Sequence, residues 1–403
     1  METWKKNLWI LWFGTFIVSS SFSMVVPFLP LFLIQIGVKD HIELWSGILF
    51  SSVFLAGAIS SPFWGAIGDK YGRKPMIIRA GIVLFVTYIM LAFVTNQHQL
   101  LVIRILQGLL TGFIPGSIAL VGTSTPEKKV GYALSMMATA TATGTIMGPL
   151  LGGILSKLFD SRLTFACAGV LCLIATLLVI FWVKEENFVP TKDSGSIVNT
   201  IRIASVNRPF MIVLLLSLLT QFSVMTIEPV LPLYIVEIGH SAKDASLVAG
   251  FVFSLVGIAS ILFAARWGKL ADRIGFQKVL LIGLLAGGIG TLAQIPFQNI
   301  WWFSIIRFTY GIFFCAVFPA LNGLVVRTTD SDFRGRAFSL NQTANQFGGM
   351  LGPLVGGAIS GIFSIHMVFW VTGILLLATM GLAFWTQRTA PVPVSASGIN
   401  KKG

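Results

Sequence analysis

Three charged side chains lie deep within long apolar runs of the sequence: Glu228, Arg104 and Arg307. An ionised residue at the centre of a membrane-spanning helix costs about 2.5–3.5 kcal/mol, so such residues commonly serve a function. Glu228 is the only acid among them, and a carboxyl group shielded from water can take up and release a proton. We therefore predict that Glu228 exchanges protons; the alternative is a neutral, hydrogen-bonded core glutamate.

The neighbours of Glu228 indicate a cavity. Gln221, Met225 and Glu228 stand at positions i, i+4 and i+7, so they share one face of a helix. We expect this face to line a cavity in which a cationic ligand competes with the proton for the carboxylate. The matching position earlier in the chain is Val26, so the acid is an addition to a repeated scaffold.

The composition provides membrane spans to hold these residues. Hydrophobic residues make up 55% of the chain and charged residues 11%, and the mean hydropathy is +0.86. About 20 apolar residues cross a hydrocarbon layer of about 30 Å, and the sequence contains twelve such windows. The runs are continuous rather than alternating, which favours helices over a barrel. We predict an all-α integral membrane protein with twelve transmembrane helices.

The net charge of +13 follows the expected topology rather than a nucleic-acid surface. If both termini share one side, that side holds 22 of the 28 Lys and Arg. The positive-inside rule then places both termini in the cytoplasm of a multi-pass cell-membrane protein. The cationic segments are short turns interrupted by acids, so no nucleic acid is expected. The three cysteines fall inside predicted helices, so neither a metal site nor a disulfide framework is predicted.

The chain is an internal duplication with an offset near 203 residues. Asp69 and Asp272 are 203 residues apart, and Arg104 matches Arg307 at the same offset. Ordered landmarks of this kind predict two six-helix halves around a central cavity, which a monomer can enclose. The predicted division is a first half 1–184, a cytoplasmic linker 185–208, a second half 209–387 and a disordered tail 388–403.

A charged turn separates the predicted spans 44–67 and 76–95. Its residues are Gly65, Asp69, Gly72, Arg73 and Lys74, and its second copy retains Asp272 but has Phe276 and Gln277 in place of the paired cations. Gly72 is expected to adopt a backbone conformation that other residues resist. Asp69 is expected to accept hydrogen bonds from a neighbouring helix N-terminus near Arg334 and Arg336. The alternative is a turn whose cations only anchor topology.

A stripe of small residues marks the predicted fifth span. Gly144, Gly148 and Gly152 recur every four residues, with Pro149 and Gly153 beside them. Such a stripe lets another helix approach closely, and proline removes a hydrogen bond and favours a bend. We predict close packing and a functional bend, against ordinary small-residue packing.

Aromatic and polar residues of the later spans are candidates for binding flat amphipathic ligands by stacking and a few polar contacts. They are Phe314, Phe318, Asn341, Asn345, Phe347 and Met350.

These motifs resemble those of the major facilitator superfamily across nearly the whole chain. The turn at Gly65 to Lys74 resembles its loop signature, and the glycine stripe resembles the motif of its drug:proton antiporters. Within that family, short segments of this sequence most resemble those of twelve-span multidrug exporters. The resemblance implies gating by Asp69 and proton transfer involving Arg104, whose alternative is snorkelling towards the cytoplasmic face.

The predicted function is therefore proton-coupled export of amphipathic drugs, with fluoroquinolones and cationic dyes implied by the resemblance. No cofactor is expected, because the proton gradient supplies the energy. The alternative within transport is an exporter or facilitator of a sugar, peptide or other metabolite. A membrane enzyme or receptor is disfavoured, because the sequence has no catalytic cluster and its loops are short.

Overall fold

Helices account for all regular structure in the described part of the chain, which comprises residues 2–185, 197–239, 242–330 and 333–389 of a computed structural model. The first group is α1 (Thr3–Met24), α2 (Leu29–Gln35), α3 (Ile42–Tyr71), α4 (Arg73–Ala92), α5 (Gln97–Leu110), α6 (Phe113–Ser124), η1 (Glu127–Lys129), α7 (Val130–Leu158) and α8 (Ser161–Trp182). The second is α9 (Ile197–Val206), α10 (Arg208–Ile227), α11 (Leu231–Glu237), α12 (Ala242–Ile274), α13 (Phe276–Leu292), α14 (Ile300–Phe314), α15 (Val317–Thr328), α16 (Arg334–Ile362) and α17 (Ile365–Thr389).

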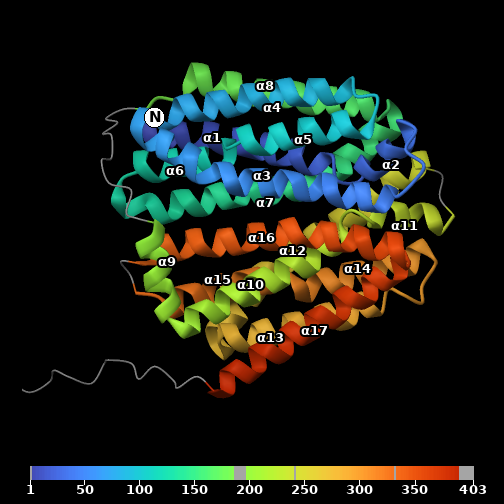
Figure 1. The fold of residues 1–403 in the computed structure, drawn as a ribbon. Helices are drawn as coiled ribbons and strands as arrows, with labels where there is room; N and C mark the ends of the chain where they lie inside the picture. Colours follow the sequence, from blue (N-terminus) through green and yellow to red (C-terminus); the bar gives the residue numbers. More distant parts are fainter. Residues whose placement is uncertain (1, 186–196, 240–241, 331–332, 390–403) are drawn as a thin grey trace, which may run out of the picture.

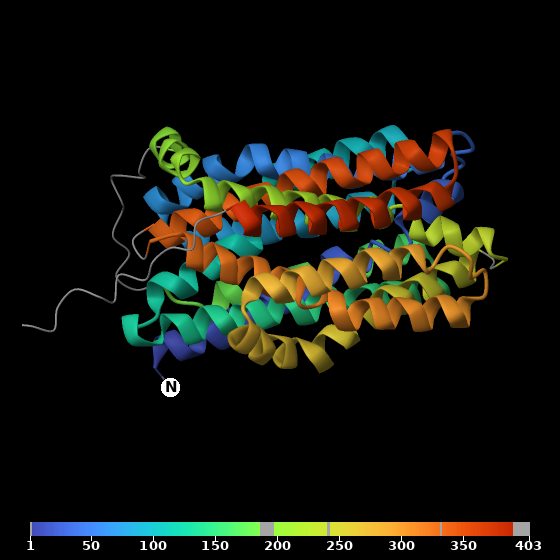
Figure 2. The same cartoon turned by 90° about the horizontal axis from the view of Figure 1, so that it is seen from below.

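The long helices run roughly side by side along one direction, as Figures 1 and 2 show. Helices α1 to α8 form one group and α9 to α17 the other, and the two groups lie next to each other in Figure 1. Three pairs of helices in the described residues join the groups: α3 packs on α16, α7 packs on α12, and α2 makes a smaller contact with α11. The N-terminus and α9 lie at one end of the molecule, and α2 and α11 lie at the opposite end.

The prediction of an all-helical membrane protein is confirmed at the level of apolar helices. Nine helical segments of the described residues are long and apolar enough to cross a membrane, or ten with the bent pair α1 and α2. Helix α13 is apolar but short, and α16 is long but carries many glycines and amides. The full count of twelve therefore stays a prediction.

Two long helices break at matching prolines. The axis bends by 49° between α1 and α2, where Pro27 and Pro30 stand, and α10 gives way to α11 at Pro229 and Pro232. Proline lacks a backbone N–H, so a helix bends or ends where two of them are close together. Glu228 is the residue that ends α10, directly at this break.

The buried apolar residues form separate cores in the two groups. One cluster runs from Leu8 to Val183 and belongs entirely to the first group. Two further clusters belong to the second group alone. A fourth cluster joins Leu31 of α2 to residues of α11, α12 and α14, so the shared core lies at the end where α2 and α11 are found.

The predicted linker and tail lie partly outside the described residues. Helix α9 occupies the end of the predicted linker 185–208, a helix that the sequence analysis did not anticipate. Residues 186–196 and 390–403 are not described, so the predicted tail is largely outside the structure.

Candidate functional site

The two groups of helices touch through glycines that have exact counterparts in each group. A Cβ placed on Gly47 of α3 would lie 3.1 Å from the carbonyl carbon of Pro353 and 3.3 Å from the Cα of Gly357. A Cβ on Gly250 of α12 would meet Pro149 and Gly153 at the same distances. The two crossings are therefore backbone-to-backbone contacts with no room for side chains.

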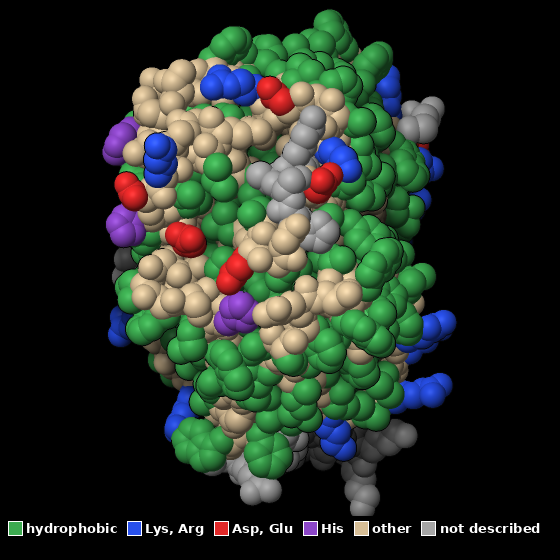
Figure 3. Space-filling model, turned by 90° about the vertical axis from the view of Figure 1, so that its right-hand side faces the viewer, with side chains coloured by type: hydrophobic (Ala, Val, Ile, Leu, Met, Phe, Trp, Pro, Cys, Tyr) green, Lys and Arg blue, Asp and Glu red, His purple; other side chains and the backbone are tan. Residues whose placement is uncertain are grey.

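Polar contacts reinforce these crossings. The Ser51 hydroxyl donates to the Met350 carbonyl at 2.5 Å, and the Ser254 hydroxyl donates to the Ile146 carbonyl at 2.9 Å. Figure 3 shows the end of the molecule that holds α2 and α11, where acidic and histidine side chains lie on the surface. One exposed ion pair, Lys157 with Asp244 at 2.9 Å, also joins the groups here.

The same four helices are open at their other ends. A Cβ on Gly65 of α3, Gly131 of α7, Gly268 of α12 or Gly335 of α16 would meet nothing within 4 Å. The contacts between groups thus lie at the α2 and α11 end. The structure is closed at that end, and the four glycines nearest to the opposite end make no close contact between the groups.

The predicted glycine stripe of α7 is confirmed as a close-packing surface, and its partner is α1. A Cβ on Gly144 would lie 2.7 Å from the Phe16 carbonyl oxygen, and one on Gly152 would lie 2.8 Å from the Met24 carbonyl carbon. Gly148 faces the same stretch of α1. Helix α7 continues through Pro149, so the predicted bend stays a prediction.

The motif has a second contact surface that was not predicted from the sequence. Pro149 and Gly153 face α12 across the boundary between the groups, while the glycine stripe faces α1 within one group. The motif therefore packs against two helices, α1 and α12. The signal was present in the sequence, because Gly47 and Gly250 are also 203 residues apart.

The charged turn is tighter than predicted. Helix α3 extends to Tyr71 and α4 begins at Arg73, so the connection is the single residue Gly72. Its φ of +101° is a conformation that L side chains rarely adopt, which confirms the predicted role of this glycine. The predicted windows ended too early because charged residues continue the helices beyond the apolar core.

The predicted partner of Asp69 was wrong for this conformation. Asp69 forms an ion pair with Arg73 one turn away, rather than with the start of α16 near Arg334 and Arg336. The physical reason is the separation of the groups at this end, where a Cβ on Gly65 or Gly335 would meet no atom of another helix within 4 Å.

Glu185, which sequence analysis did not select, caps the first turn of α4. Its carboxylate accepts from the backbone N–H groups of Arg73 at 2.8 Å and Lys74 at 2.9 Å. A carboxylate at a helix N-terminus satisfies unpaired donors and complements the helix dipole. The Lys74 ammonium also donates to the Ile180 carbonyl at 3.1 Å, so α3, α4 and the end of α8 are held together.

The second copy of the turn is held by an aromatic ring. Gly275 has a φ of +96°, and Phe276 packs against Gly323 of α15 and lies 4.9 Å from the Arg327 guanidinium. Asp272 forms no salt bridge with any residue in the described ranges. The two turns share a backbone but not their chemistry.

Arg104 is a buried cation that forms no salt bridge with any acid among the described residues. Its side chain is 4% exposed, it donates to the Gln107 side chain at 3.0 Å, and its Nε has no partner. It lines a cavity of about 20 Å³ with residues of α1, α3 and the α1–α2 break, which are Phe22, Val25, Val26, Phe50, Val53 and Phe54. The fully buried position excludes snorkelling to the surface in this conformation.

Arg307 is similarly buried in the second group but has an acid within reach. Its guanidinium donates to Gln294 at 3.3 Å and lies 5.5 Å from the Tyr310 ring. Glu228 interacts with it electrostatically, although the two form no direct salt bridge in the described structure. The structure thus brings Glu228 and Arg307 together, as it brings Val26 and Arg104 together in the first group.

The predicted stripe on α10 packs partly against α16. A Cβ on Gly348 would lie 2.9 Å from the Cβ of Gln221, and one on Gly352 would lie 2.7 Å from that of Met225. Both side chains keep part of their surface exposed. Their part in lining a cavity stays a prediction.

Two predicted cavity residues are corrected. Phe314 is 5% exposed and stacks on Tyr310 at 4.9 Å, against Gly287 of α13, so it belongs to the core. Phe347 is 44% exposed and shares a stripe with Leu351 and Leu354. That stripe lies away from the faces of α16 that contact α3 and α10, which places Phe347 towards the membrane.

The remaining cavity candidates are two amides with unpaired oxygens and two apolar side chains that are partly exposed. Asn341 donates to the Asn322 side chain at 3.2 Å, and the side-chain oxygens of Asn341 and Asn345 are buried without a partner. Phe318 and Met350 are partly exposed. Asn341 and Asn345 share one face of α16 because residues i and i+4 lie on the same side of a helix, and their part in lining a cavity stays a prediction.

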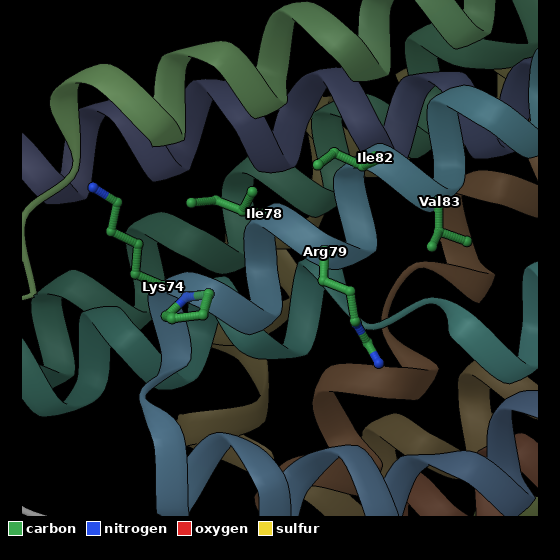
Figure 4. Close-up of a pocket in the computed structure, with 6 residues that line it drawn as sticks. Lys74, Ile78, Arg79, Ile82 and Val83 are labelled. Carbon is green, nitrogen blue, oxygen red and sulfur yellow. The ribbon is translucent and has the colours of Figure 1, made fainter.

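A groove along α4 is lined by residues of that helix alone and includes a structural arginine (Figure 4). Its lining residues are Lys74, Pro75, Ile78, Arg79, Ile82 and Val83, all on α4. The Arg79 guanidinium lies 3.3 Å from the Trp64 ring and donates to the Thr111 carbonyl at 3.3 Å. Arg79 therefore ties α4 to α3 and to the break between α5 and α6, a structural role.

Comparison with known proteins agrees with this architecture. The chain is 34% identical over 395 residues to the multidrug resistance protein MdtG of Proteus mirabilis, covering 96% of this chain and 97% of that protein. It is 36% identical over 381 residues to MdtG of Salmonella typhimurium, covering 93% of each.

Solved transporter structures share the fold at low sequence identity. The nucleoside transporter NupG superposes with a TM-score of 0.77 at 16% identity, covering 96% of this chain and 100% of that one. A bacterial homologue of the lysosomal transporter Spinster gives 0.78 at 14% identity, covering 98% and 100%. The description Major Facilitator Superfamily matches residues 11–267 and 218–402, so this chain belongs to the major facilitator superfamily of membrane transporters.

Proposed function

We propose that this protein exports amphipathic drugs across the cell membrane in exchange for protons, by alternating access between its two groups of helices. The relatives at 34% and 36% identity are multidrug resistance proteins, which supports export of several drugs. Fluoroquinolones and cationic dyes are the proposed substrates, and the proton gradient is the proposed energy source. A monomer suffices, because one duplicated chain encloses the pathway.

The proposed topology has twelve spans. The pairs α1–α2, α5–α6, α10–α11 and α14–α15 each count as one broken span, and α9 lies outside the membrane. The excess of Lys and Arg on the side of the N-terminus supports cytoplasmic termini. The divisions at 184, 208 and 387 then separate two halves, a linker and a tail.

The observation that carries alternating access is the one-sided junction between the halves. Glycine-to-backbone contacts close the α2 and α11 end, and the opposite ends of the same helices are free. With cytoplasmic termini, the structure represents a state open to the cytoplasm. Rocking of the two halves would separate them at the α2 and α11 end and bring the opposite ends of these helices together, so that Asp69 would approach α16.

The proposed proton carrier is Glu228. It stands at a helix break, where backbone carbonyls are free to interact with a polar group. Arg307 supplies an opposite charge when the carboxyl is ionised. Arg104 forms no salt bridge with an acid in the described structure, so its proposed part in proton transfer rests on the family resemblance alone.

The test uses everted membrane vesicles with an imposed pH gradient and ethidium as the probe. Wild-type protein is expected to move ethidium, and Glu228→Gln is expected to reduce gradient-driven movement more than tenfold. Wild-type rates in Glu228→Gln would remove the proton role. A wild-type protein that ignores ethidium and fluoroquinolones but moves a sugar or peptide would support the metabolite transporter instead.

A further inference from the structure

We propose that Arg104 is a docking site for the carboxylate of an aromatic substrate. This inference rests on the proposed function and specifies one class of molecule that the transporter carries. The site lies in the first half, apart from the proton carrier Glu228.

Arg104 lacks a counter-charge among the described residues. A buried cation is costly unless it is paired, and Arg104 is buried with its Nε unpaired. Its polar neighbours in the described structure are neutral: Gln107 accepts one hydrogen bond, and the Tyr88 hydroxyl is engaged with the Ser21 carbonyl at 3.1 Å. The position therefore favours an incoming anion.

The second step is the match between guanidinium and carboxylate. Arginine presents planar donors that fit a carboxylate, and such charge-assisted hydrogen bonds are stronger than neutral ones. The unpaired amide nitrogen of Gln107 adds another donor at the same place. A carboxylate that replaced the hydrogen bond between Arg104 and Gln107 could accept from both side chains.

The third step is the wall of the cavity. Its volume of about 20 Å³ is enough for about one water, or for part of a carboxylate head group. Phe22, Val26 and Phe54 keep part of their surface exposed, so the wall is not sealed. An aromatic ring following its carboxylate would stack against Phe22 and Phe54.

The second half provides an internal control for this inference. Glu228 stands at the position that matches Val26, and it gives Arg307 the counter-charge that Arg104 lacks. Installing the same acid in the first half should therefore occupy Arg104 with an internal carboxylate. Val26→Glu tests the site while leaving the arginine in place.

The experiment measures binding of 2-naphthoate and of its neutral analogue 2-naphthalenemethanol to purified full-length protein, without a pH gradient. Wild type is expected to prefer the carboxylate by about tenfold or more, since hydrogen bonds to charged groups have this weight. Arg104→Gln and Val26→Glu are each expected to abolish the preference while retaining the neutral ligand. Arg307→Gln is the matched control and is expected to retain it.

Equal binding of both ligands to wild type would overturn the proposal, as would an unchanged preference in Arg104→Gln. Loss of the preference in Arg307→Gln alone would also overturn it. Retained binding of 2-naphthalenemethanol separates loss of the site from misfolding. Because no gradient is used, failure here leaves ethidium export untouched, and failure of ethidium export leaves this result standing.

Discussion

The two halves of this transporter share one backbone plan and differ in where they place charge. In the first half a buried arginine stands alone and the turn after α3 is held by Asp69 and Glu185. In the second half the buried arginine has Glu228 nearby, and the corresponding turn is held by Phe276. The halves thus share a duplicated backbone plan, and the residues that differ at these positions change where each half carries charge.

Two packing features that involve the backbone of a neighbouring helix recur in both halves. Gly47 and Gly250 contact the opposite half at equal distances, and a hydrogen bond from Trp64 to Leu109 at 2.7 Å recurs from Trp267 to Ile312 at 2.6 Å. Close packing tolerates little change in volume, whereas a side chain facing a small cavity can be exchanged. The shared glycines therefore lie where the halves pack closely, and the halves differ at Glu228 and in the residues that follow Gly72 and Gly275.

The largest expected effect comes from enlarging the symmetric contacts. Gly153→Leu and Gly357→Leu should each force the halves apart at the closed end. Overpacking costs about 1–3 kcal/mol, which corresponds to roughly five- to hundredfold in the population of the closed state. Ethidium efflux should fall by a similar factor, measured in vesicles at equal expression.

The matched controls are Gly131→Leu on α7 and Gly361→Leu on α16. These glycines would meet nothing within 4 Å of a new Cβ, so efflux should stay close to the wild-type rate. A control as damaging as Gly153→Leu would show that helix composition matters rather than the junction. Unequal losses in Gly153→Leu and Gly357→Leu would break the symmetry inferred for the two crossings.

Much of this architecture was predictable from local patterns. The proline breaks, the stripe at Gly144 and the positive φ of Gly72 follow from the properties of single residue types. The side facing α12 was not predictable from Pro149 alone, because it depends on how two distant helices cross. Phe314 and Phe347 were misplaced for the same reason: aromatic residues suit a core, a cavity and a lipid face equally well.

The next largest expected effect is a difference in ethidium efflux between variants of the two buried arginines. Arg307→Gln removes the opposite charge near Glu228, and an ionised carboxylate partly shielded from water is disfavoured without a counter-charge. Proton-driven ethidium efflux should therefore fall about tenfold. Arg104→Gln leaves no acid unpaired, so efflux of this carboxylate-free cation should stay within about threefold of wild type. Equal losses in both variants would show that the charge asymmetry between the halves has no bearing on coupling.

The smallest expected effect compares the two glycine turns. Gly72→Ala and Gly275→Ala both impose a positive φ on a residue with a side chain, at a cost of about 1–2 kcal/mol. A Cβ at position 72 would also lie 3.0 Å from the Glu185 carboxylate, whereas one at 275 would meet nothing within 4 Å. Displacing the cap on α4 adds about 1 kcal/mol to the first variant alone.

Thermal unfolding of the detergent-solubilised protein should therefore show a lower Tm for Gly72→Ala than for Gly275→Ala. Combining each change with Glu185→Gln gives the decisive comparison. The difference between the two glycine variants should shrink in that background, because the cap is already weakened. A difference that persists unchanged would mean that Glu185 does not distinguish the two turns, and the contrast between polar and aromatic anchoring would then lie in Arg73 and Phe276 themselves.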